Sequence, residues 1–509
     1  MTASTNLASI VAESAYRYPE KNAMVLGDIA VSYSALWLRA RQYATVLREQ
    51  GIKPGDRVAL LVPNVPQFPM AYYGILALGA VVVPIHSLLV ANEIEYAITD
   101  SESKALIVAG PLLEEGAEGA ALAGVPAFTV MSDSDAFLQL DTAAASATPL
   151  AQAVTRSPAD EAVILYTSGT TGAPKGAVLT HDNIMWNATL CAFDTLGIHH
   201  DDVLFAALPL FHSFGQVAVM NAAFRAGATL ALVPRFDPAT VMDVIESANV
   251  TLFAGVPTMF IALLAVAKAD PRRPQFRMAV SGGASLPVAV IDAVKETFGA
   301  DIYEGYGLSE TSPVATFNQS HYGRKPGSVG RAVWGVDVEI AEADVEGEII
   351  LKGADEMGEI VIRGHNVFAG YLNKPEATAE VTVDDWFRTG DLGYKDEDGF
   401  VFIVDRKKDL IIRGGFNVYP REVEEVLMRH DAVAQVAVVA TPHETHGEEI
   451  TAVVVLVDGA EVSEVDLISW SQGELAKHKY PRVIHFVADL PLGPSGKILK
   501  REIVAKLAE

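Results

Sequence analysis

Short apolar runs that alternate with amphipathic helical stretches constrain this chain more than any other feature. Such runs, bounded by turn residues, are typical of buried parallel strands, because helices cover both faces of a parallel sheet. The alternation therefore predicts an α/β fold with doubly wound sheets. The predicted strands of this part are 57–62, 80–84, 105–108, 162–166, 203–205, 228–233, 251–253 and 278–280, and its predicted helices include 6–18, 34–50 and 72–78.

The pattern changes after Gly327, where 336–340, 347–352 and 359–363 have the composition of strands. These segments predict a smaller β-barrel-like subdomain over about 328–404. A charged segment, 405–409, then precedes a region of mixed type. Its predicted elements are helices 421–430 and 464–477 and strands 434–439 and 451–457.

A chain of 509 residues is too long for a single hydrophobic core, which stops growing at about 250–300 residues. We therefore predict an N-terminal domain (1–404), a hinge (405–409) and a small mobile α+β C-terminal domain (410–509). The Ala-rich stretch 117–153 is poorly patterned and predicts a variable surface region.

Composition excludes several classes of function. The formal net charge of -26 argues against a nucleic-acid partner, which needs clustered Lys and Arg. It does not exclude an anionic substrate, because a local group of dipoles and cations can override the global field. The single cysteine, Cys191, allows no intrachain disulfide, and a buried thiol is the expected role. Neither a signal peptide nor an apolar span of about 20 residues is visible, so a cytoplasmic protein without a transmembrane segment is expected.

A loop rich in Gly and Thr follows the predicted strand 162–166. Glycine allows the backbone to approach a ligand closely, and backbone N–H groups and hydroxyls can surround phosphate oxygens while Lys175 adds a positive charge. The loop is not an ordinary P-loop, because Gly176 and not Ser or Thr follows Lys175. Taken alone, it fits either a phosphate site or a flexible surface turn.

Further motifs follow this loop along the chain. Five further segments follow it in order: Phe211–Gly215, Tyr303–Glu310, Trp386–Asp391, Asp405–Asp409 and Pro494–Lys497. Together with Tyr166–Gly176, they resemble the signatures of the adenylate-forming superfamily, which includes acyl-CoA synthetases, peptide-synthetase adenylation domains and firefly luciferase. The resemblance covers essentially the whole chain.

The resemblance implies a set of nucleotide-binding residues. Glu310 and Thr167 resemble the ligands of Mg²⁺, a cation that prefers oxygen. Asp391 corresponds to the ribose ligand and Arg406 to a ribose and phosphate contact. The alternative for Glu310 is a solvated surface acid, and that for Asp391 and Arg406 is an ordinary surface salt bridge. The implied ATP- and AMP-binding residues are Thr167, Ser168, Gly169, Thr170, Thr171, Gly172, Lys175, Gly283, Ala284, Glu304, Gly305, Tyr306, Gly307, Ser309, Asp391, Arg406 and Lys497.

The remaining implied roles concern the acid and coenzyme A (CoA). Lys497 resembles the lysine that bridges the substrate carboxylate and the α-phosphate, and Lys408 matches the hinge residue. His212 resembles a histidine of the acyl site, where it would gate the acyl tunnel or hydrogen-bond the carboxylate. The alternative is an ordinary core histidine. The implied CoA-binding residues are Gly414, Gly415 and Phe416, and the implied acyl-pocket residues are Trp186, Phe211, His212, Met220, Val256, Gly282 and Gly283.

The implied activity is that of an acyl-CoA synthetase. It uses ATP, Mg²⁺ and CoA to convert a hydrophobic carboxylic acid through acyl-AMP into acyl-CoA, with a medium- or long-chain fatty acid as the expected substrate. Three other enzymes fit the same motifs: a ligase for an aryl, terpenoid or other bulky acid, a ligase that loads a carrier protein, and an amino-acid-activating enzyme. The last is disfavoured because Phe211–Gly215 contains no acid to hold an ammonium group. A non-catalytic nucleotide-binding protein is the alternative from another class, and a homodimer is possible.

Overall fold

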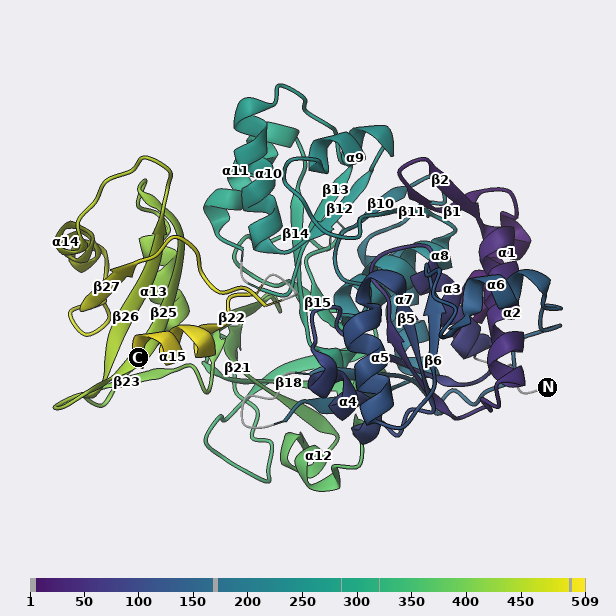
Figure 1. Ribbon diagram of the computed structural model, residues 1–509. Helices are drawn as coiled ribbons and strands as arrows, with labels where there is room; N and C mark the ends of the chain where they lie inside the picture. The colour runs from purple at the N-terminus through teal and green to yellow at the C-terminus, as the bar shows by residue number, and fades with distance from the viewer. Residues whose placement is uncertain (1–5, 168–172, 285, 320, 494–496, 509) are drawn as a thin grey trace.

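The computed structural model describes residues 6–167, 173–284, 286–319, 321–493 and 497–508 (Figure 1). The chain forms two large sheets with helices between and around them, a smaller sheet beside these, and a C-terminal α+β unit. This arrangement confirms the predicted α/β fold. Among the described residues, no helix is long and apolar enough to cross a membrane.

The first large sheet has the strand order β19-β9-β8-β4-β3-β5-β6-β7. Its strands from β8 to β7 run parallel, as the apolar runs predicted, whereas β9 and β19 are antiparallel additions at one edge. The bounds are β3 (Arg57–Leu61), β4 (Val81–Pro84), β5 (Ala105–Ala109), β6 (Ala127–Val130), β7 (Leu138–Gln139), β8 (Glu161–Thr167), β9 (Lys175–Thr180) and β19 (Gly370–Tyr371).

The second large sheet has the order β16-β15-β14-β13-β12-β10-β11-β1-β2. Its centre is parallel, and antiparallel strands lie at both edges. The bounds are β1 (Asn22–Leu26), β2 (Ile29–Ser32), β10 (Val203–Ala206), β11 (Thr229–Leu232), β12 (Leu252–Gly255), β13 (Met278–Ser281), β14 (Ile302–Gly307), β15 (Val314–Phe317) and β16 (Arg331–Ala332).

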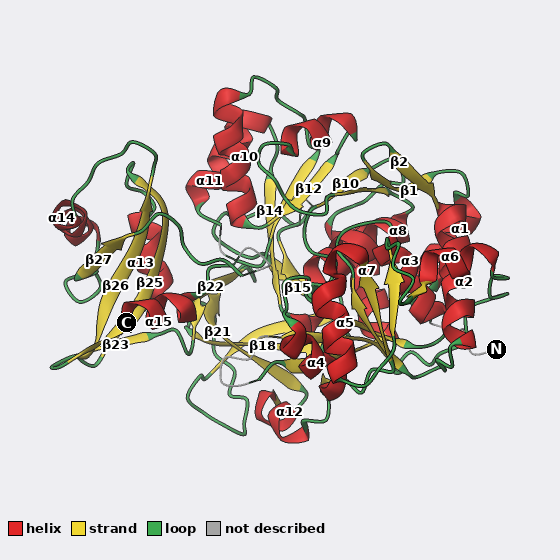
Figure 2. Ribbon diagram, viewed as in Figure 1, coloured by secondary structure: helices red, strands yellow, loops and turns green. Residues whose placement is uncertain are grey.

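Buried helices connect the two sheets through one continuous core. In α3, every residue from Phe68 to Ala77 except Met70 is buried, and Tyr73 donates a hydrogen bond to Asn221 across the core. Helices α4 and α5 pack together over the outer face of the first sheet, and α10 and α11 lie beside the second (Figure 2). The bounds are α1 (Ser9–Arg17), α2 (Tyr33–Glu49), α3 (Gln67–Ala77), α4 (Ala91–Asp100), η1 (Gly110–Leu112), α5 (Leu113–Leu122), α6 (Leu140–Ser146), α7 (His181–Leu190), η2 (Cys191–Thr195), η3 (Phe214–Asn221), α8 (Ala222–Ala226), α9 (Val241–Ser247), α10 (Pro257–Ala269), α11 (Val288–Phe298) and η4 (Ser309–Thr311).

The stretch 117–153 is more regular than its composition predicted. It contains the end of α5, strands β6 and β7, and α6, because small Ala and Gly side chains allow close packing against α4 and β5. The thiol of Cys191 is buried, as expected, and burial raises its pKa to about 12.

The β-rich region forms an antiparallel sheet of order β17-β18-β21-β20, with β22 beside β21. The predicted strand 347–352 is wrong: only Leu351 forms a bridge, with Ala341. The bounds are β17 (Val336–Ala341), β18 (Gly358–Gly364), α12 (Pro375–Val381), β20 (Thr382–Val383), β21 (Trp386–Lys395) and β22 (Val401–Arg406).

The C-terminal unit has a five-stranded sheet of order β24-β23-β26-β25, with β27 beside β26. A separate cluster of buried residues, which includes Ile411, Val438 and Leu467, forms its core. The bounds are β23 (Ile411–Arg413), β24 (Phe416–Val418), α13 (Pro420–Leu427), β25 (Val433–His443), β26 (Gly447–Leu456), α14 (Glu464–Glu474), β27 (Val483–Phe486) and α15 (Lys500–Ala508).

Candidate active site

The predicted phosphate loop joins the antiparallel strands β8 and β9. Thr167 and Lys175 face each other at its base, and the Thr167 hydroxyl donates to the Lys175 carbonyl at 3.4 Å. An ordinary P-loop joins a strand to a helix, so the difference seen in the motif is also a difference in topology. The predicted residues Ser168, Gly169, Thr170, Thr171 and Gly172 lie outside the described residues.

Tyr371 connects this loop to the predicted metal ligand, and sequence analysis did not identify it. Its hydroxyl donates to Oε1 of Glu310 at 2.9 Å, and Nζ of Lys175 lies 5.0 Å from its ring centroid. The two-residue strand β19 holds Tyr371 beside β9. Burial and the neighbouring Glu310 raise the pKa of Tyr371 above its usual value, so the phenol stays protonated and donates. Only the fold reveals this residue, because a Gly-Tyr pair is a weak signal.

Glu310 lies in the short helix η4, directly after β14 and Leu308. Its side chain is buried, and its carbonyl accepts a hydrogen bond from the amide of Phe368 at 2.9 Å. The neighbouring Ser309 lies against another motif, with its Oγ 3.5 Å from that of Ser213. Two sequence signatures that are about a hundred residues apart in the chain therefore meet here.

Strand β14 carries the residues predicted to bind adenine. A side chain at Gly305 would place Cβ 2.7 Å from the Phe317 ring, and one at Gly307 would place it 1.7 Å from the Pro313 carbonyl oxygen. Glycine is therefore required by close packing at both positions. Glu304 is buried, and this burial raises its pKa to about 7. Ala284, in the loop after β13, is exposed.

Asp391 and Arg406 pair across β21 and β22. The Asp391 carboxylate is buried, with Oδ1 3.2 Å from Nε of Arg406, and Oδ2 accepts a hydrogen bond from the Tyr306 hydroxyl at 2.6 Å. The structure thus brings together three predicted nucleotide residues from separate motifs. The guanidinium of Arg406 remains largely exposed, so it can reach a ligand.

Lys497 projects from the C-terminal unit into a small pocket of the N-terminal domain. Its Cε lies 3.6 Å from the place that a Cβ on Gly283 would occupy, and Gly283 has a φ of +82°. Burial and the nearby Arg406 lower the pKa of Lys497 to about 8. The pocket is lined by Leu208, Pro209, His212, Phe214, Val256, Gly283 and Lys497.

His212 is neutral in this pocket. Its Nδ1 accepts a hydrogen bond from the amide of Phe214 at 3.2 Å, so the proton is on Nε2. Burial and Lys497 lower its pKa to about 4. His86, which sequence analysis did not single out, has the same tautomer, since its Nδ1 accepts from the Leu88 amide at 2.8 Å. Its ring packs on Phe211 with centroids 4.5 Å apart.

The predicted acyl-pocket residues divide into two groups. His212, Val256 and Gly283 line the pocket with Lys497, and Gly282 lies against the Phe214 ring. Met220 instead packs fully buried in the core. Trp186 is 39% exposed and forms an aromatic cluster with Trp334 and His365, at centroid distances of 5.5 and 5.6 Å.

The predicted hinge and CoA residues lie on the C-terminal side of Arg406. Strand β22 extends through Arg406, so the turn consists of Lys407, Lys408 and Asp409. Gly414 and Gly415, with φ of +57° and +84°, form the tip of the β23–β24 hairpin, and the exposed Phe416 ring lies 5.0 Å from His478. These contacts are within the C-terminal unit, whereas Lys497 enters the N-terminal domain.

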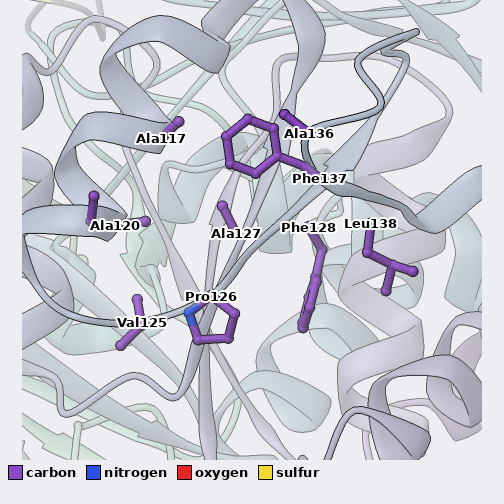
Figure 3. Close-up of a pocket in the computed structure, with 10 residues that line it drawn as sticks. Ala117, Ala120, Val125, Pro126, Ala127, Phe128, Ala136, Phe137 and Leu138 are labelled. Carbon is purple, nitrogen blue, oxygen red and sulfur yellow. The ribbon is translucent and has the colours of Figure 1, made fainter.

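A second pocket, of about 380 Å³, lies between α5, β6 and the segment before β7 (Figure 3). Its lining consists of Ala, Val, Pro, Phe and Leu side chains. Such groups can neither bind phosphate nor exchange a proton, so this second pocket is not a candidate for the chemistry.

Comparisons with known proteins identify the family of the chain. The model of the AMP-binding enzyme family matches residues 11–372, and that of the AMP-binding enzyme C-terminal domain matches residues 422–497. A long-chain-fatty-acid–CoA ligase of Bacillus subtilis is 36% identical over 99% of this chain and 95% of its own length. A feruloyl-CoA synthase of Amycolatopsis is 37% identical over 95% and 96%. The crystal structure of ATP-bound MatB from Rhodopseudomonas palustris has a TM-score of 0.90 at 33% identity, over 100% and 99% of the two chains. The chain therefore belongs to the AMP-binding enzyme family, the adenylate-forming superfamily predicted from its motifs, and is an AMP-forming acid–thiol ligase.

Proposed function

We propose that this enzyme activates a hydrophobic carboxylic acid, with a medium- or long-chain fatty acid as the preferred substrate. One observation carries the proposal: the ammonium of Lys497 and Nε2–H of His212 lie in a pocket whose other side chains are apolar. Two polar groups can hold a carboxylate there, while Leu208, Pro209, Phe214 and Val256 contact the carbon chain next to it. The similarity to a long-chain-fatty-acid–CoA ligase supports the same class of acid.

In the first half-reaction, the substrate carboxylate attacks the α-phosphate of ATP, which yields acyl-AMP and pyrophosphate. The protein's task is positioning and charge stabilisation. Asp391 accepts hydrogen bonds from the ribose hydroxyls, and the glycines of β14 leave space for the flat adenine. Lys497 lies between the acid and the α-phosphate, where negative charge grows in the transition state.

The residues at Glu310 fit a magnesium ion. A buried carboxylate, with one oxygen bonded to Tyr371, and the hydroxyl of Thr167 are oxygen ligands of the kind that Mg²⁺ prefers. Bound Mg²⁺ would neutralise charge on the phosphate oxygens. Tyr371 would hold the carboxylate in place, and Lys175 would contact the departing pyrophosphate.

In the second half-reaction, the CoA thiol attacks acyl-AMP, so acyl-CoA forms and AMP leaves. Lys497 lies in the pocket proposed to hold the acid, where the thiol must also approach, so we propose that the C-terminal domain (410–509) turns away from the N-terminal domain (1–404) before this step. We propose that Lys408, in the hinge 405–409, allows this rotation and that Gly414, Gly415 and Phe416 then line the path of the pantetheine. The separate core of the C-terminal unit supports movement as one body.

Pyrophosphate release across a panel of fatty, aryl, terpenoid and dicarboxylic acids tests the proposal. Each acid is assayed with and without CoA, and with hydroxylamine to trap acyl-AMP. Fatty acids should give the highest kcat/KM, and AMP release should depend on CoA. Fastest turnover with a dicarboxylic acid, or acyl transfer to a carrier protein but not to CoA, would contradict it.

An aryl acid is the second candidate substrate. The similarity to a feruloyl-CoA synthase favours it, and the Phe214 ring beside Gly282 could contact a flat substrate. The same panel distinguishes the two by their kcat/KM values. A cytoplasmic location and a homodimer stay predictions.

A further inference from the structure

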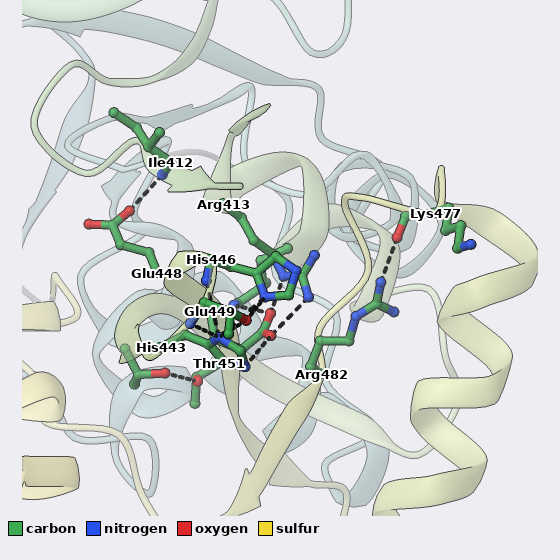
Figure 4. A network of polar contacts seen from close by, with 12 residues as sticks. Ile412, Arg413, His443, His446, Glu448, Glu449, Thr451, Lys477 and Arg482 are labelled. Atoms are coloured by element: carbon green, nitrogen blue, oxygen red, sulfur yellow. Dashed lines mark hydrogen bonds and ion pairs between the residues drawn. The ribbon is translucent and has the colours of Figure 1, made fainter. Parts of the chain in front are cut away.

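A group of two histidines and a glutamate lies at the end of the β25–β26 hairpin, outside the pocket of Lys497 (Figure 4). His443 ends β25, His446 is in the turn, and Glu449 is near the start of β26. Nitrogen and oxygen atoms of the three side chains that can bind a metal all lie within 4.8 Å of one another. We call this group the hairpin cluster.

The two imidazole rings face each other with the same ring nitrogen, Nδ1. Nδ1 of His443 lies 3.2 Å from Nδ1 of His446. Two nitrogens bound to one Zn²⁺ at about 2.0–2.1 Å, with a tetrahedral or octahedral angle between them, are separated by about 2.9–3.4 Å. The observed separation is that of two neighbouring metal ligands. The turn is exposed, so a cation from solvent can reach both rings.

Glu449 supplies the third ligand. It is buried, and both oxygens accept hydrogen bonds from Arg413. Its Oε2 lies 3.8 Å from Nε2 of His443, which is not the nitrogen that faces His446, so the His443 ring must turn for all three side chains to bind one ion. A carboxylate has about four acceptor positions, and Arg413 and the Ile450 amide occupy three of them, so one position, on Oε2, is free for a metal. The pairing with Arg413 also fixes the orientation of the carboxylate, as outer partners of metal ligands commonly do. Two further acids, Glu444 and Glu448, lie in the same hairpin.

We propose that the hairpin cluster binds a divalent transition-metal ion of the Zn²⁺ class, with His443, His446 and Glu449 as ligands and water in the fourth position. Two imidazoles and one carboxylate are a ligand set that suits Zn²⁺, whereas Mg²⁺ and Ca²⁺ prefer oxygen alone. This site is separate from the magnesium site proposed at Glu310.

Metal binding also affects the neighbouring β23–β24 hairpin. The amide of Gly414 donates to the carbonyl of His446 at 2.9 Å, and a Cβ on Gly414 would lie 3.2 Å from Cδ2 of His446. A metal bound to the His446 ring therefore also restrains the turn whose carbonyl accepts the hydrogen bond from the Gly414 amide. Opening of this hydrogen bond should become rarer when the site is filled.

Calorimetric titration of the full-length enzyme with ZnCl₂, in excess Mg²⁺ to fill the Glu310 site, tests the proposal. We expect one Zn²⁺ per chain. His443→Ala and His446→Ala should each weaken binding at least about 10–100-fold, the loss typical even for partners outside the ligand shell. His485→Ala is the matched control, because this exposed histidine lies on β27 of the same sheet and should leave binding unchanged.

Hydrogen exchange gives a second readout that does not depend on catalysis. Zn²⁺ should slow exchange of the Gly414 amide in the wild type and in His485→Ala but not in the His443→Ala/His446→Ala double variant. Adenylation by the double variant without Zn²⁺ should equal that of the wild type, which shows that it folds. Absence of Zn²⁺ binding by the wild type, or equal binding by the double variant, would overturn the proposal.

Discussion

Nε of Arg406 lies 3.2 Å from Oδ1 of Asp391, so the last residue before the turn Lys407–Asp409 is paired with the carboxylate predicted to hold the ribose. The other oxygen of Asp391 accepts a hydrogen bond from Tyr306. A nucleotide that bonds to Asp391 therefore changes a contact made by the segment that joins the two domains.

A double-mutant cycle on Asp391 and Arg406 should reveal this coupling. Asp391→Ala should raise the KM for ATP about tenfold or more, as loss of a hydrogen bond to a charged group does. The double variant should be less impaired than the sum of the two single changes, because the residues are in direct contact. Pyrophosphate release at varied ATP measures the effects, and strict additivity would show that the pair is not coupled in the working enzyme.

Lys497→Ala should slow acyl-AMP formation by roughly 10²–10³-fold, because a positive charge at the transition state is lost. Transfer from supplied acyl-AMP to CoA should be nearly unchanged. The two half-reactions are measured separately, by pyrophosphate release and by acyl-CoA formation. Lys506→Ala, at an exposed position of α15, is the control. Equal losses in both half-reactions would refute the proposed role of Lys497.

Acyl-AMP formation should decline at alkaline pH. The lowered pKa of Lys497, about 8, means that the ammonium is present below this pH and is lost as the pH rises through it. The kcat/KM for ATP should therefore fall about tenfold per pH unit above that value. The pKa of His212 is lowered to about 4, so its imidazole is neutral at and above neutral pH. His212 should therefore add no inflection near neutrality to the pH profile of kcat/KM. Lys497→Arg should move the alkaline limb upward, and an unshifted limb would assign it to another group.

Tyr371→Phe should raise the Mg²⁺ concentration for half-maximal activity by about tenfold, because Glu310 loses a charge-assisted hydrogen bond. The Phe ring still lies beneath Lys175. Tyr371→Leu removes both contacts and should in addition raise the KM for ATP. Magnesium titrations at saturating ATP measure the first effect. An unchanged Mg²⁺ requirement in Tyr371→Phe would show that the hydrogen bond does not position Glu310.

Lys408→Pro should impair the second half-reaction more than the first, because proline fixes φ where the proposed hinge must change it. Lys408→Ala keeps the backbone free and serves as the control. Acyl-AMP should accumulate in the proline variant, as seen by trapping with hydroxylamine. If the ratio of the two rates stays that of the wild type, the hinge lies at another residue.

Most of the parallel strands could be predicted from sequence because each is a short apolar run between turns. The structure confirms the predicted strands as β3, β4, β5, β8, β10, β11, β12 and β13, whereas β6 and β14 were not predicted. Segment 347–352 also looked like a strand, yet it lacks a partner over its length and forms one bridge. Within the site, contiguous motifs identified Glu310, Asp391 and Lys497. Tyr371 and His86 were missed because their roles come from pairing with residues far away in the chain.

Trp186 shows a second limit of prediction from sequence, since it was expected in the acyl pocket. Its aromatic character and its position on α7 suited an apolar pocket, but its ring packs at a tilt against Trp334 and His365 at the surface. Which face of a helix meets which neighbour is decided by tertiary packing. The apolar residue types alone carry no information on that choice.

The pocket around Lys497 has walls from both domains, and this bears on how the enzyme selects its acid. Six of its lining residues belong to the region 1–404, and the seventh, Lys497, belongs to the C-terminal unit. In the proposed domain rotation, the space next to the substrate carboxylate is therefore complete only while the C-terminal domain is docked. On this proposal, discrimination among acids that differ near the carboxyl group becomes a property of domain closure: a poorly fitting acid should still enter but should keep the two domains apart.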